Sequence, residues 1–443
     1  MIGDDTPAIF RDPLPEAVDV AVIGAGIAGT ATAWFLARAG VSVLLCEKGR
    51  VAGEQSSRNW GWVRQQGRDE AELPIMMEAN RLWRGLAEQT GEPGLAFTPS
   101  GCVHVAPDRQ KLAKFEAWCE TAGRHQLDTR MLTRNEVGEL LPGVACDWIG
   151  GMATPSDGRS EPGLAVPALA RAAHRSGVAI VEYCAVRTLD LEGGRLAGIV
   201  TERGRVRCGS AVLAGGAWSG HFADNAGFGL PQLLARATVM RTGPAAHVVR
   251  PNVSLGGLAL RRRDDGGYTV ATGLVDHFIG PPSFRHAWRF RRLLKQSARE
   301  LRLLPAAPRG YPGAWATARR WTGGEESPFE RVRVLDPAPS PAAVRRIRAR
   351  LPQQVPALAD AGLAGAWAGM IDVTPDAVPV LGPSDAIPGL WIATGFSGHG
   401  FGIGPAVGRI TADLVRGRPP GHDLGRFRPG RFFDGSAIVP GPY

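Results

Sequence analysis

Three glycines near the start of the chain have the spacing of a phosphate-binding turn. Gly24, Gly26 and Gly29 form a Gly-x-Gly-x-x-Gly motif, between an apolar run typical of a β-strand and an alanine-rich run typical of a helix. The first glycine allows a tight turn, the second lets a pyrophosphate approach the backbone, and the third lets the helix lie close to the sheet. The N-terminus of that helix offers unpaired N–H groups and the positive end of its dipole. The residues expected to hold the phosphates of a dinucleotide are Gly24, Ala25, Gly26, Ile27, Ala28 and Gly29.

An acidic residue follows at the distance that dinucleotide binding requires. The run VSVLLCE predicts a second buried strand ending at Glu47, roughly 20 residues beyond the motif. A carboxylate there can accept hydrogen bonds from both hydroxyls of an adenosine ribose, and Lys48 beside it is expected in the same site. Gly40 is expected to end the intervening helix, which completes a βαβ unit. A tight structural turn without a ligand is the alternative.

The polar loop after the second strand favours FAD over NAD. The segment EQSSRNWGWVR carries Ser56 and Ser57, whose hydroxyls can bond a pyrophosphate or a ribityl chain, and Gly61, which would let the backbone approach a flat ring. FAD extends further into a protein than NAD and needs several distant segments around it. An ordinary polar loop is the alternative.

Four segments spread over the chain carry a family resemblance. They are VIGAGIAG with Glu47, the loop SSRNWGW, the central AVLAGGAWS, and TPDAVPVLGP followed by GLWIATGFSGHGFGIGPAVG. With these segments, from residue 18 to about 417, the chain resembles the D-amino-acid oxidase superfamily of FAD-dependent oxidoreductases, which includes glycine, sarcosine and D-amino-acid oxidising enzymes. The resemblance implies an α/β protein in which a Rossmann-like FAD-binding domain is interleaved with an antiparallel-sheet substrate domain.

The resemblance also implies roles at the matching positions. The glycine turn and Glu47 would hold the ADP half, Val186 would lend its backbone to the adenine, and Gly215 would lie near the ADP moiety. The residues implied along the ribityl chain and the flavin are Ser56, Ser57, Trp60, Gly61 and Trp62. Those implied at the pyrimidine edge are Gly398, His399, Gly400, Phe401, Gly402 and Ile403, where the N-terminus of the last helix would stabilise the negative charge of the reduced ring.

Two residues are expected at the substrate. Arg64 lies three residues after Gly61, where the sarcosine-oxidising relatives have an arginine that binds the substrate carboxylate, and a guanidinium suits bidentate pairing. In so arginine-rich a chain, a surface or ion-pairing role is the alternative. His399 is expected over the flavin edge, where it either polarises the substrate or bonds its own loop.

Two departures from the sarcosine-oxidising pattern bear on the cofactor and the substrate. Those relatives have a lysine where this chain has Gly402, so a second carboxylate anchor is absent at that position. They also have a cysteine shortly before the TPD motif that bonds the flavin covalently, whereas the corresponding run here is WAGMIDVTPD, and the SSRNWGW loop has no histidine for such a bond. We therefore expect tightly bound but non-covalent FAD.

Composition excludes several classes of protein. The 443 residues are 44% hydrophobic, which excludes a disordered chain. The net charge of +9 comes almost entirely from arginine, and much of it lies on two helices expected at 284–304 and 342–351. We interpret these as solvated faces, so nucleic acid is not an expected partner. Residues 1–16 do not resemble a signal peptide, the uncharged run 20–37 is too poorly hydrophobic for a membrane span, and the 6 cysteines show no disulfide or metal-binding spacing. A reduced, cytoplasmic protein without a metal is expected.

The order of elements predicts two interleaved domains. We assign residues 18–80, 150–228 and 362–430 to the FAD-binding domain and residues 81–149 and 229–361 to the substrate domain. A helix is expected over 73–88, and Asp264 begins a hairpin turn that ends at Gly267.

These observations predict an oxidoreductase that oxidises the C–N bond of an amino acid or N-substituted amino acid. Hydride would pass to flavin N5 and the resulting imine would hydrolyse in water, with O₂ or another electron acceptor reoxidising the cofactor. A hydroxy-acid or polyol-phosphate dehydrogenase of the same fold, an RNA-modifying flavoprotein and a subunit that depends on a partner chain are the alternatives. The sequence does not indicate the substrate side chain, its chirality or the oligomeric state.

Overall fold

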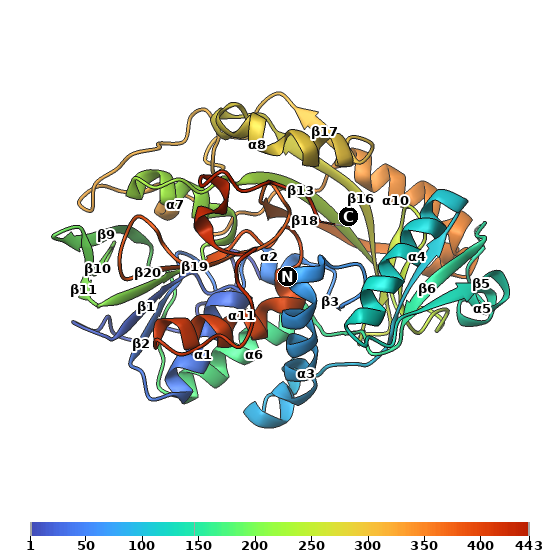
Figure 1. Cartoon of the computed structure of the whole chain (residues 1–443), viewed down its shortest axis with the longest axis horizontal. Coiled ribbons are helices and arrows are strands. Elements are labelled where there is room, and N and C mark those ends of the chain that lie inside the picture. Colours follow the sequence, from blue (N-terminus) through green and yellow to red (C-terminus); the bar gives the residue numbers. More distant parts are fainter. Residues whose placement is uncertain (1, 146, 442–443) are drawn as a thin grey trace.

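The N-terminal βαβ unit forms the centre of a six-stranded sheet. The computed structural model describes residues 2–145 and 147–441 (Figure 1). The strand order is β19-β20-β12-β1-β2-β8, and all neighbours are parallel except β19 and β20. The bounds are β1 Val20–Ile23, β2 Val43–Cys46, β8 Ala179–Val181, β12 Ser210–Leu213, β19 Val380–Pro383 and β20 Leu390–Thr394. Segments from both ends of the chain therefore meet in one sheet.

Alternating side chains of the sheet bury two different cores. On β1, Val20 and Val22 face a helical layer, whereas Ala21 and Ile23 face a three-stranded antiparallel sheet. The helical layer consists of α1 (Ile27–Arg38), α6 (Pro162–Arg175) and α11 (Gly400–Val415), with α3 (Leu73–Thr90) against α11. The three-stranded sheet consists of β9 (Val186–Glu192), β10 (Arg195–Thr201) and β11 (Gly204–Arg207). A parallel sheet covered on both faces explains the almost uninterrupted apolar strands.

A nine-stranded sheet makes up the other half of the molecule, toward the right of Figure 1. Its order is β18-β13-β16-β15-β14-β4-β6-β5, with β17 paired to β16, and only the β4–β14 and β16–β17 pairs are parallel. The bounds are β4 Cys102–Ala106, β5 Arg130–Thr133, β6 Gly150–Thr154, β13 Leu233–Thr242, β14 Asn252–Ser254, β15 Ala259–Arg262, β16 Tyr268–Phe278, β17 Leu301–Leu304 and β18 Leu363–Val373. The largely antiparallel sheet and the parallel sheet together confirm the expected fold class.

The expected domain boundaries remain predictions. Their division at 150 and 362 assigns β6 and β18 to the cofactor domain, although both strands pair within the nine-stranded sheet. The pairing favours boundaries after β6 and after β18. The hairpin turn from Asp264 to Gly267 is confirmed, since it joins β15 to β16.

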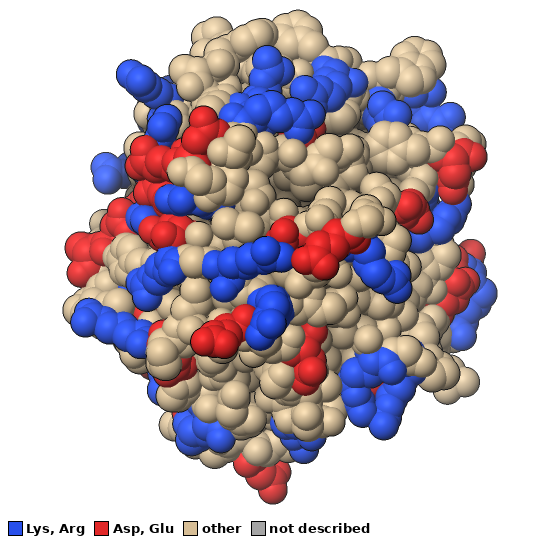
Figure 2. Space-filling view, turned by 90° about the vertical axis from the view of Figure 1, so that its left-hand side faces the viewer, with Lys and Arg blue, Asp and Glu red and all other residues tan. Residues whose placement is uncertain are grey.

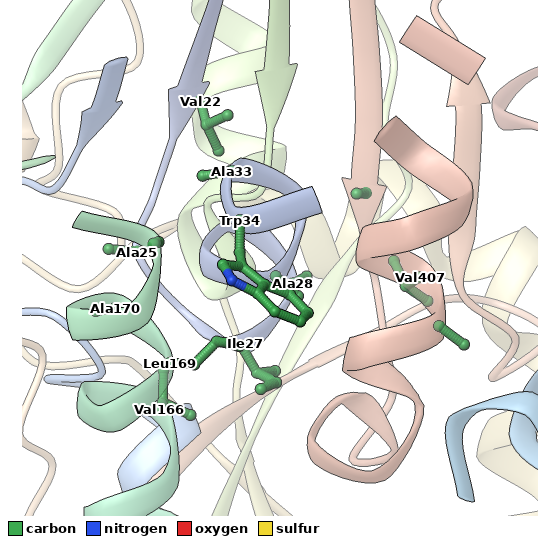
Figure 3. Packing of buried hydrophobic residues seen from close by; sticks show 14 of the residues in the cluster. Val22, Ala25, Ile27, Ala28, Ala33, Trp34, Val166, Leu169, Ala170 and Val407 are labelled. Atoms are coloured by element: carbon green, nitrogen blue, oxygen red, sulfur yellow. The ribbon is translucent and has the colours of Figure 1, made fainter. Parts of the chain in front are cut away.

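Helix α1 lies between α6 and α11, and Trp34 is a large residue of this buried cluster. Figure 3 shows the Trp34 ring, with Ile27 and Ala28, between Val166 and Leu169 of α6 and Val407 of α11. The two helices α1 and α11 approach closely because α11 has glycines on the facing side. A Cβ at Gly404 would lie 2.4 Å from a side-chain carbon of Ile27.

Two expected helices end differently in the structure. The helix expected over 284–304 is wrong in its second part, because α8 covers Pro281–Ser297 and Leu301–Leu304 form β17. The last four residues pair with the edge of β16, and this tertiary pairing overrides their helical spacing. The second basic helix, α10 (Pro341–Gln354), does not stop at Pro352, which lies in its last turn. The helix expected over 73–88 corresponds to α3.

Five further helices complete the fold. They are α2 (Gln55–Arg58), α4 (Arg109–Arg124), α5 (Arg134–Leu140), α7 (Ser219–Ala226) and α9 (Pro328–Arg331). Across residues 2–145 and 147–441, no helix combines the length and apolar character needed to cross a bilayer. The same ranges contain no cluster of three or more metal-ligating side chains.

We predict that alanine at Gly408 separates the two central helices. Its Cβ would lie 2.4 Å from the Cβ of Ala31 and 2.7 Å from the backbone nitrogen of Thr32, so the backbones must shift. A loss of about 1–3 kcal/mol in the free energy of unfolding is expected, measured by urea denaturation. Gly123→Ala on α4 is the control, because a Cβ there meets nothing within 4 Å, and it should be neutral or stabilising. Equal stability of the Gly408 variant and the wild type would contradict the close contact.

Candidate functional site

The glycine turn has the backbone geometry that the motif predicts. Gly24 has φ of +103°, and a Cβ there would lie 2.6 Å from the carbonyl oxygen of Ala214 at the end of β12. A Cβ on Gly29 would lie 1.9 Å from the carbonyl oxygen of Gly24, so only glycine allows α1 to begin so close to the turn. Gly26 caps α1 without a side chain, and no acidic residue lies in the first turn. The positive end of α1 is therefore open to an anionic group.

The carboxylate of Glu47 is fixed by two backbone donors. Its Oε2 accepts from the Ala25 nitrogen at 2.9 Å and its Oε1 accepts from the Gly49 nitrogen at 2.9 Å. Burial raises the pKa of Glu47, while the Lys48 ammonium and the two N–H donors act in the opposite direction. Each oxygen keeps a further lone pair, so the carboxylate is oriented by the protein and can still accept from two ligand hydroxyls.

A cleft with an empty volume of about 840 Å³ opens beside this turn. The predicted residues that line it are Gly24, Gly26, Glu47, Lys48, Ser56, Val186 and Gly215. Ala25, Ile27, Ala28 and Gly29 are not among its lining residues, and the Ile27 nitrogen donates to Ser56 Oγ at 2.9 Å. The glycine cradle, the open helix terminus and the oriented carboxylate fit the ADP half of a dinucleotide.

Lys48 lies in the cleft, but its ammonium is already bonded within the protein. Its Nζ donates to Glu54 Oε1 at 2.6 Å and to the carbonyl oxygens of Val332 and Arg333 at 2.8 and 2.9 Å. It also lies 4.6 Å from the ring centroid of Trp218. A direct bond from Lys48 to a ligand stays a prediction. In the structure, Lys48 bonds the segment at Val332 and Arg333, which the sequence did not single out.

The two segments predicted at the flavin meet at the N-terminus of α11. The short strand β3 (Trp62–Val63), paired with β7 (Gly158–Arg159), lies against this helix. A Cβ on Gly402 would lie 3.4 Å from the carbonyl oxygen of Trp62. The rings of Trp60 and Trp62 are 5.5 Å apart, edge to face, and Trp62 packs on the nine-stranded sheet. Both segments lie outside the walls of the ADP cleft, as does Ser57, which is buried within α2.

Gly61 is required by the protein itself. It has φ of +78°, and a Cβ there would lie 2.6 Å from the carbonyl oxygen of Ser160. The close approach of Ser160 therefore explains this glycine without a flat ring, and the role toward the flavin stays a prediction.

Arg64 is a partly buried cation without an acidic partner. Its Nη1 donates to the carbonyl oxygen of Gln66 at 2.5 Å, and its guanidinium carbon lies 5.8 Å from the Trp62 ring centroid. Among the residues that the structure describes, no carboxylate forms an ion pair with it. The guanidinium is near enough to α11 to help lower the pKa of His399. The structure therefore does not support the alternative that Arg64 serves in an ion pair, and its role toward a ligand stays a prediction.

A buried aspartate shapes the segment that carries Arg64. Asp157 accepts from the Gln65 nitrogen at 2.7 Å through Oδ1 and from the Gln66 nitrogen at 3.2 Å through Oδ2. Its side chain is inaccessible to solvent, and this burial raises the pKa of Asp157 to about 6. Because the aspartate bonds the backbone directly after Arg64, it fixes where that side chain begins.

The turn 395–399 is held in a similar way from β18. Asp372 Oδ2 accepts from the nitrogens of Gly395 and Phe396 at 2.7 and 3.3 Å, and burial raises the pKa of Asp372 to about 6. Ser397 has a left-handed backbone with φ of +50°. The turn delivers His399 as the N-cap of α11, where no acidic residue occupies the first turn.

His399 faces inward onto another buried group. Its Nδ1 lies 3.4 Å from Glu72 Oε2, and its side chain is 11% exposed. Burial, followed by repulsion from Arg68 and Arg64, holds the pKa of His399 well below its usual value. The imidazole is therefore neutral at physiological pH.

The sequence did not single out Glu72, Asp157 or Asp372. Glu72 stands in the polar run GRDEAE and Asp157 in TPSDG, and both runs look like solvated turns. Asp372 had a usable signal, because a charge at the end of the apolar strand WAGMIDV must find donors when it is buried.

Comparison with known proteins gives the family of the chain. Residues 19–414 match the family described as FAD dependent oxidoreductase. The chain belongs to this family. It is therefore an FAD-dependent oxidoreductase, as the glycine motif and the SSRNWGW loop predicted, and the cleft fits the ADP half of that cofactor.

Similar proteins include enzymes of amine and amino-acid oxidation. The chain is 27% identical over 419 residues to 4-methylaminobutanoate oxidase (formaldehyde-forming) of Paenarthrobacter nicotinovorans, covering 94% of this chain but only 46% of that protein. It is 28% identical to D-amino acid dehydrogenase of Paramagnetospirillum magneticum, covering 90% and 95% of the two chains. The structure of L-amino acid deaminase from Proteus myxofaciens in complex with anthranilate aligns with a TM-score of 0.91 at 30% identity, covering 98% and 100%. The chain thus spans about half the length of the first of these relatives.

The surface charge agrees with the interpretation of solvated faces. On the face shown in Figure 2, Lys and Arg are interspersed with Asp and Glu over much of the surface. The basic helix α8 also has an acidic partner, since Arg285 bonds both carboxylate oxygens of Asp224 at 2.6 Å. That nucleic acid is not a partner stays a prediction.

We predict that Glu47→Gln weakens FAD binding by about 10- to 100-fold. The amide nitrogen of glutamine would face a backbone N–H, and leaving a buried donor unpaired costs about 1–3 kcal/mol. The measurement is the dissociation constant from titration of the apoprotein with FAD. Glu92→Gln is the control, because Glu92 pairs with Arg171 and Arg175 away from the cleft. The Glu92 variant should be less stable but bind FAD as the wild type does. Equal FAD affinity in the Glu47 and Glu92 variants would contradict a role of Glu47 in binding FAD.

Proposed function

We propose that the protein oxidises the C–N bond of an amino acid or N-substituted amino acid. The observation that carries this proposal is Arg64, a partly buried guanidinium with no acidic partner among the described residues, next to the N-terminus of α11. A cation kept in such a place is suited to a carboxylate ligand, since bidentate pairing with guanidinium is strong and directional.

FAD would be bound without a covalent link by the turn 24–29, Glu47 and the segments 56–62 and 398–403. When bound there, it accepts the hydride that leaves the substrate carbon. The open N-termini of α1 and α11 are suited to negative charge, one at the diphosphate and the other at the ring.

The residues of the chain would bind and orient the substrate rather than take its proton. Arg64 would hold the carboxylate, and the positive charges of Arg64 and Arg68 would favour the neutral amine over the ammonium form. A neutral amine has the lone pair that must assist loss of the α-hydrogen. Trp60 and Trp62 would keep water from the reacting carbon, and the imine product would hydrolyse after release. No general base is needed in such a scheme, because positioning supplies the rate.

The names of the similar proteins support an amino acid or N-substituted amino acid as the substrate. The relatives named above act on amino acids or on a methylamino acid, which favours this class over hydroxy acids and RNA. The likeness to an L-amino acid deaminase favours an L-amino acid. We leave O₂ and other electron acceptors as alternatives that the experiment below separates.

The test is anaerobic mixing of the FAD-loaded protein with a panel of compounds, followed by flavin absorbance. L-Amino acids or N-methyl amino acids should bleach the flavin, and D-amino acids and 2-hydroxy acids serve as comparison. Bleaching by hydroxy acids alone would overturn the proposal. Admission of air to the reduced protein then distinguishes an oxidase, which recovers its colour rapidly, from an enzyme that needs another acceptor or a partner chain.

We predict that Arg64→Met lowers kcat/KM for the amino-acid substrate by about 100-fold or more, since two hydrogen bonds to a charged group are lost. Arg64→Lys should recover part of the activity, because the charge returns without the bidentate geometry. The corresponding amine without a carboxylate should react equally poorly with all three proteins. Arg81→Met, at an exposed position on α3, is the control and should not change kcat/KM. An equal loss for the amine and the amino acid would contradict carboxylate binding.

A further inference from the structure

Glu72 is a buried acid whose carboxylate oxygens accept no hydrogen bond. It ends the short 3₁₀ helix Glu70–Glu72 before α3, and its side chain is 0% exposed. Neither of its carboxylate oxygens has a hydrogen-bond partner. Nδ1 of His399 lies 3.4 Å from Oε2. A carboxylate in such surroundings is costly in its charged form, whereas a carboxylic acid has a proton to donate.

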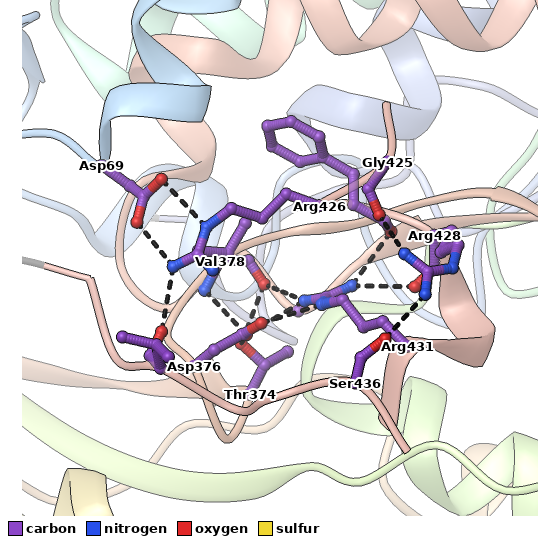
Figure 4. Close-up of polar contacts among 12 residues, drawn as sticks. Asp69, Thr374, Asp376, Val378, Gly425, Arg426, Arg428, Arg431 and Ser436 are labelled. Carbon is purple, nitrogen blue, oxygen red and sulfur yellow. Dashed lines mark hydrogen bonds and ion pairs between the residues drawn. The ribbon is translucent and has the colours of Figure 1, made fainter. Parts of the chain in front are cut away.

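The charged groups around Glu72 come from three parts of the chain. Arg68 and Asp69 lie on its own segment, Asp376 follows β18, and Arg426 lies in the C-terminal segment. Figure 4 shows that Asp69 is paired with Arg426, with Nε and Nη2 at 3.0 and 2.7 Å from its oxygens. Within this pair, Asp69 raises the pKa of Glu72 and Arg426 lowers it, so the two effects oppose each other.

The second acid is neutralised in the same way. Asp376 is bonded by Arg431 at 2.8 and 3.0 Å, and Thr374 donates to it at 3.2 Å (Figure 4). With these pairs formed, burial dominates and raises the pKa of Glu72 to about 8, although Arg68 acts in the opposite direction.

The histidine side of the contact is also kept neutral. His399 is the N-cap of α11, and a helix N-terminus disfavours a cation. Arg68 and Arg64 face it as cations and Asp69 as an anion, and burial with the two arginines holds the pKa of His399 well below its usual value. A neutral imidazole has one nitrogen that accepts and one that donates, so its partner decides which is which.

We propose that Glu72 is a positioning residue that donates the proton of its neutral carboxyl group to Nδ1 of His399. The imidazole then carries its own hydrogen on Nε2 and can only donate there. When the pH rises and Glu72 loses its proton to solvent, the carboxylate accepts from Nδ1–H, and the ring hydrogen is relocated from Nε2 to Nδ1. Glu72 thus determines whether His399 offers a donor or an acceptor; that this matters for catalysis rests on the proposed function.

The experiment reads the tautomer directly and needs no substrate. In the FAD-loaded protein labelled with ¹⁵N-histidine, the signals of His399 among the 9 histidines are assigned by their loss in His399→Gln. At pH 6–7 the wild type should show an unprotonated Nδ1 and a protonated Nε2, and the pattern should reverse as the pH rises through about 8. A protonated Nδ1 at pH 6–7 would overturn the proposal.

Two substitutions separate proton donation from packing. Glu72→Gln keeps a donor, so the Nε2–H tautomer should persist at all pH values and the reversal should vanish. Glu72→Met removes the donor, and a mixture of tautomers is expected; an unchanged tautomer there would overturn the proposal. If either variant fails to fold, infrared spectroscopy of the wild type replaces it: the carbonyl stretch of a buried carboxylic acid should disappear near pH 8, and its absence at pH 6 would count against the proposal.

A second glutamate–histidine contact provides the matched control. Glu78 on α3 bonds His422 and Arg409, so it is an ionic pair with a guanidinium partner. Glu78→Gln should leave the His399 signals unchanged, and a change there would show that the tautomer responds to general disturbance, which contradicts a specific role of Glu72. A tautomer that behaves as expected in a protein that no amino acid reduces would refute the proposed function and leave this inference standing.

Discussion

The contact between α1 and α11 is the constraint on which the site depends. The two helices belong to opposite ends of the sequence, yet Gly404 and Gly408 let them pack closely, because α11 has no side chain where Ile27 and Ala31 of α1 lie. Each N-terminus is left without an acidic residue in its first turn. Two helix dipoles are thus held at a fixed separation. In the proposed binding mode one would face the diphosphate of FAD and the other the ring, which gains negative charge on reduction.

Buried carboxylates hold the loops around these helices. Glu47, Asp157 and Asp372 each accept from at least two backbone nitrogens, in three loops that are far apart in sequence. These carboxylates therefore hold irregular backbone in place by accepting from N–H groups that would otherwise be buried without acceptors. Glu72 differs from all three, because neither of its carboxylate oxygens accepts a hydrogen bond from the backbone.

Features that depend on neighbours in sequence could be predicted, and features that depend on distant contacts could not. The motif at Gly24, its strand and its helix follow from local spacing, and the same holds for the capping Gly40. Residues 301–304 have helical spacing but become β17, because β16 offers an unpaired edge. Glu72 could not be found, since only the folded chain places α11 over a run that looks solvated. The hydrogen bonds of Lys48 to two backbone carbonyl oxygens were hidden for the same reason, because Val332 and Arg333 are far away in sequence.

The strand order has a consequence for how the chain is made. β1 and α1 are synthesised first, but their neighbours β12, β20 and α11 come from residues 210–213, 390–394 and 400–415. Until the last of these leaves the ribosome, the side of α1 that carries Ile27 and Ala31 has nothing to cover it. The nascent chain therefore exposes an apolar helix face from the synthesis of α1 until that of α11, and its folding requires contacts of very high sequence separation. Until α11 covers it, that face can bind apolar surface of other chains, so shielding of α1 during synthesis protects against aggregation.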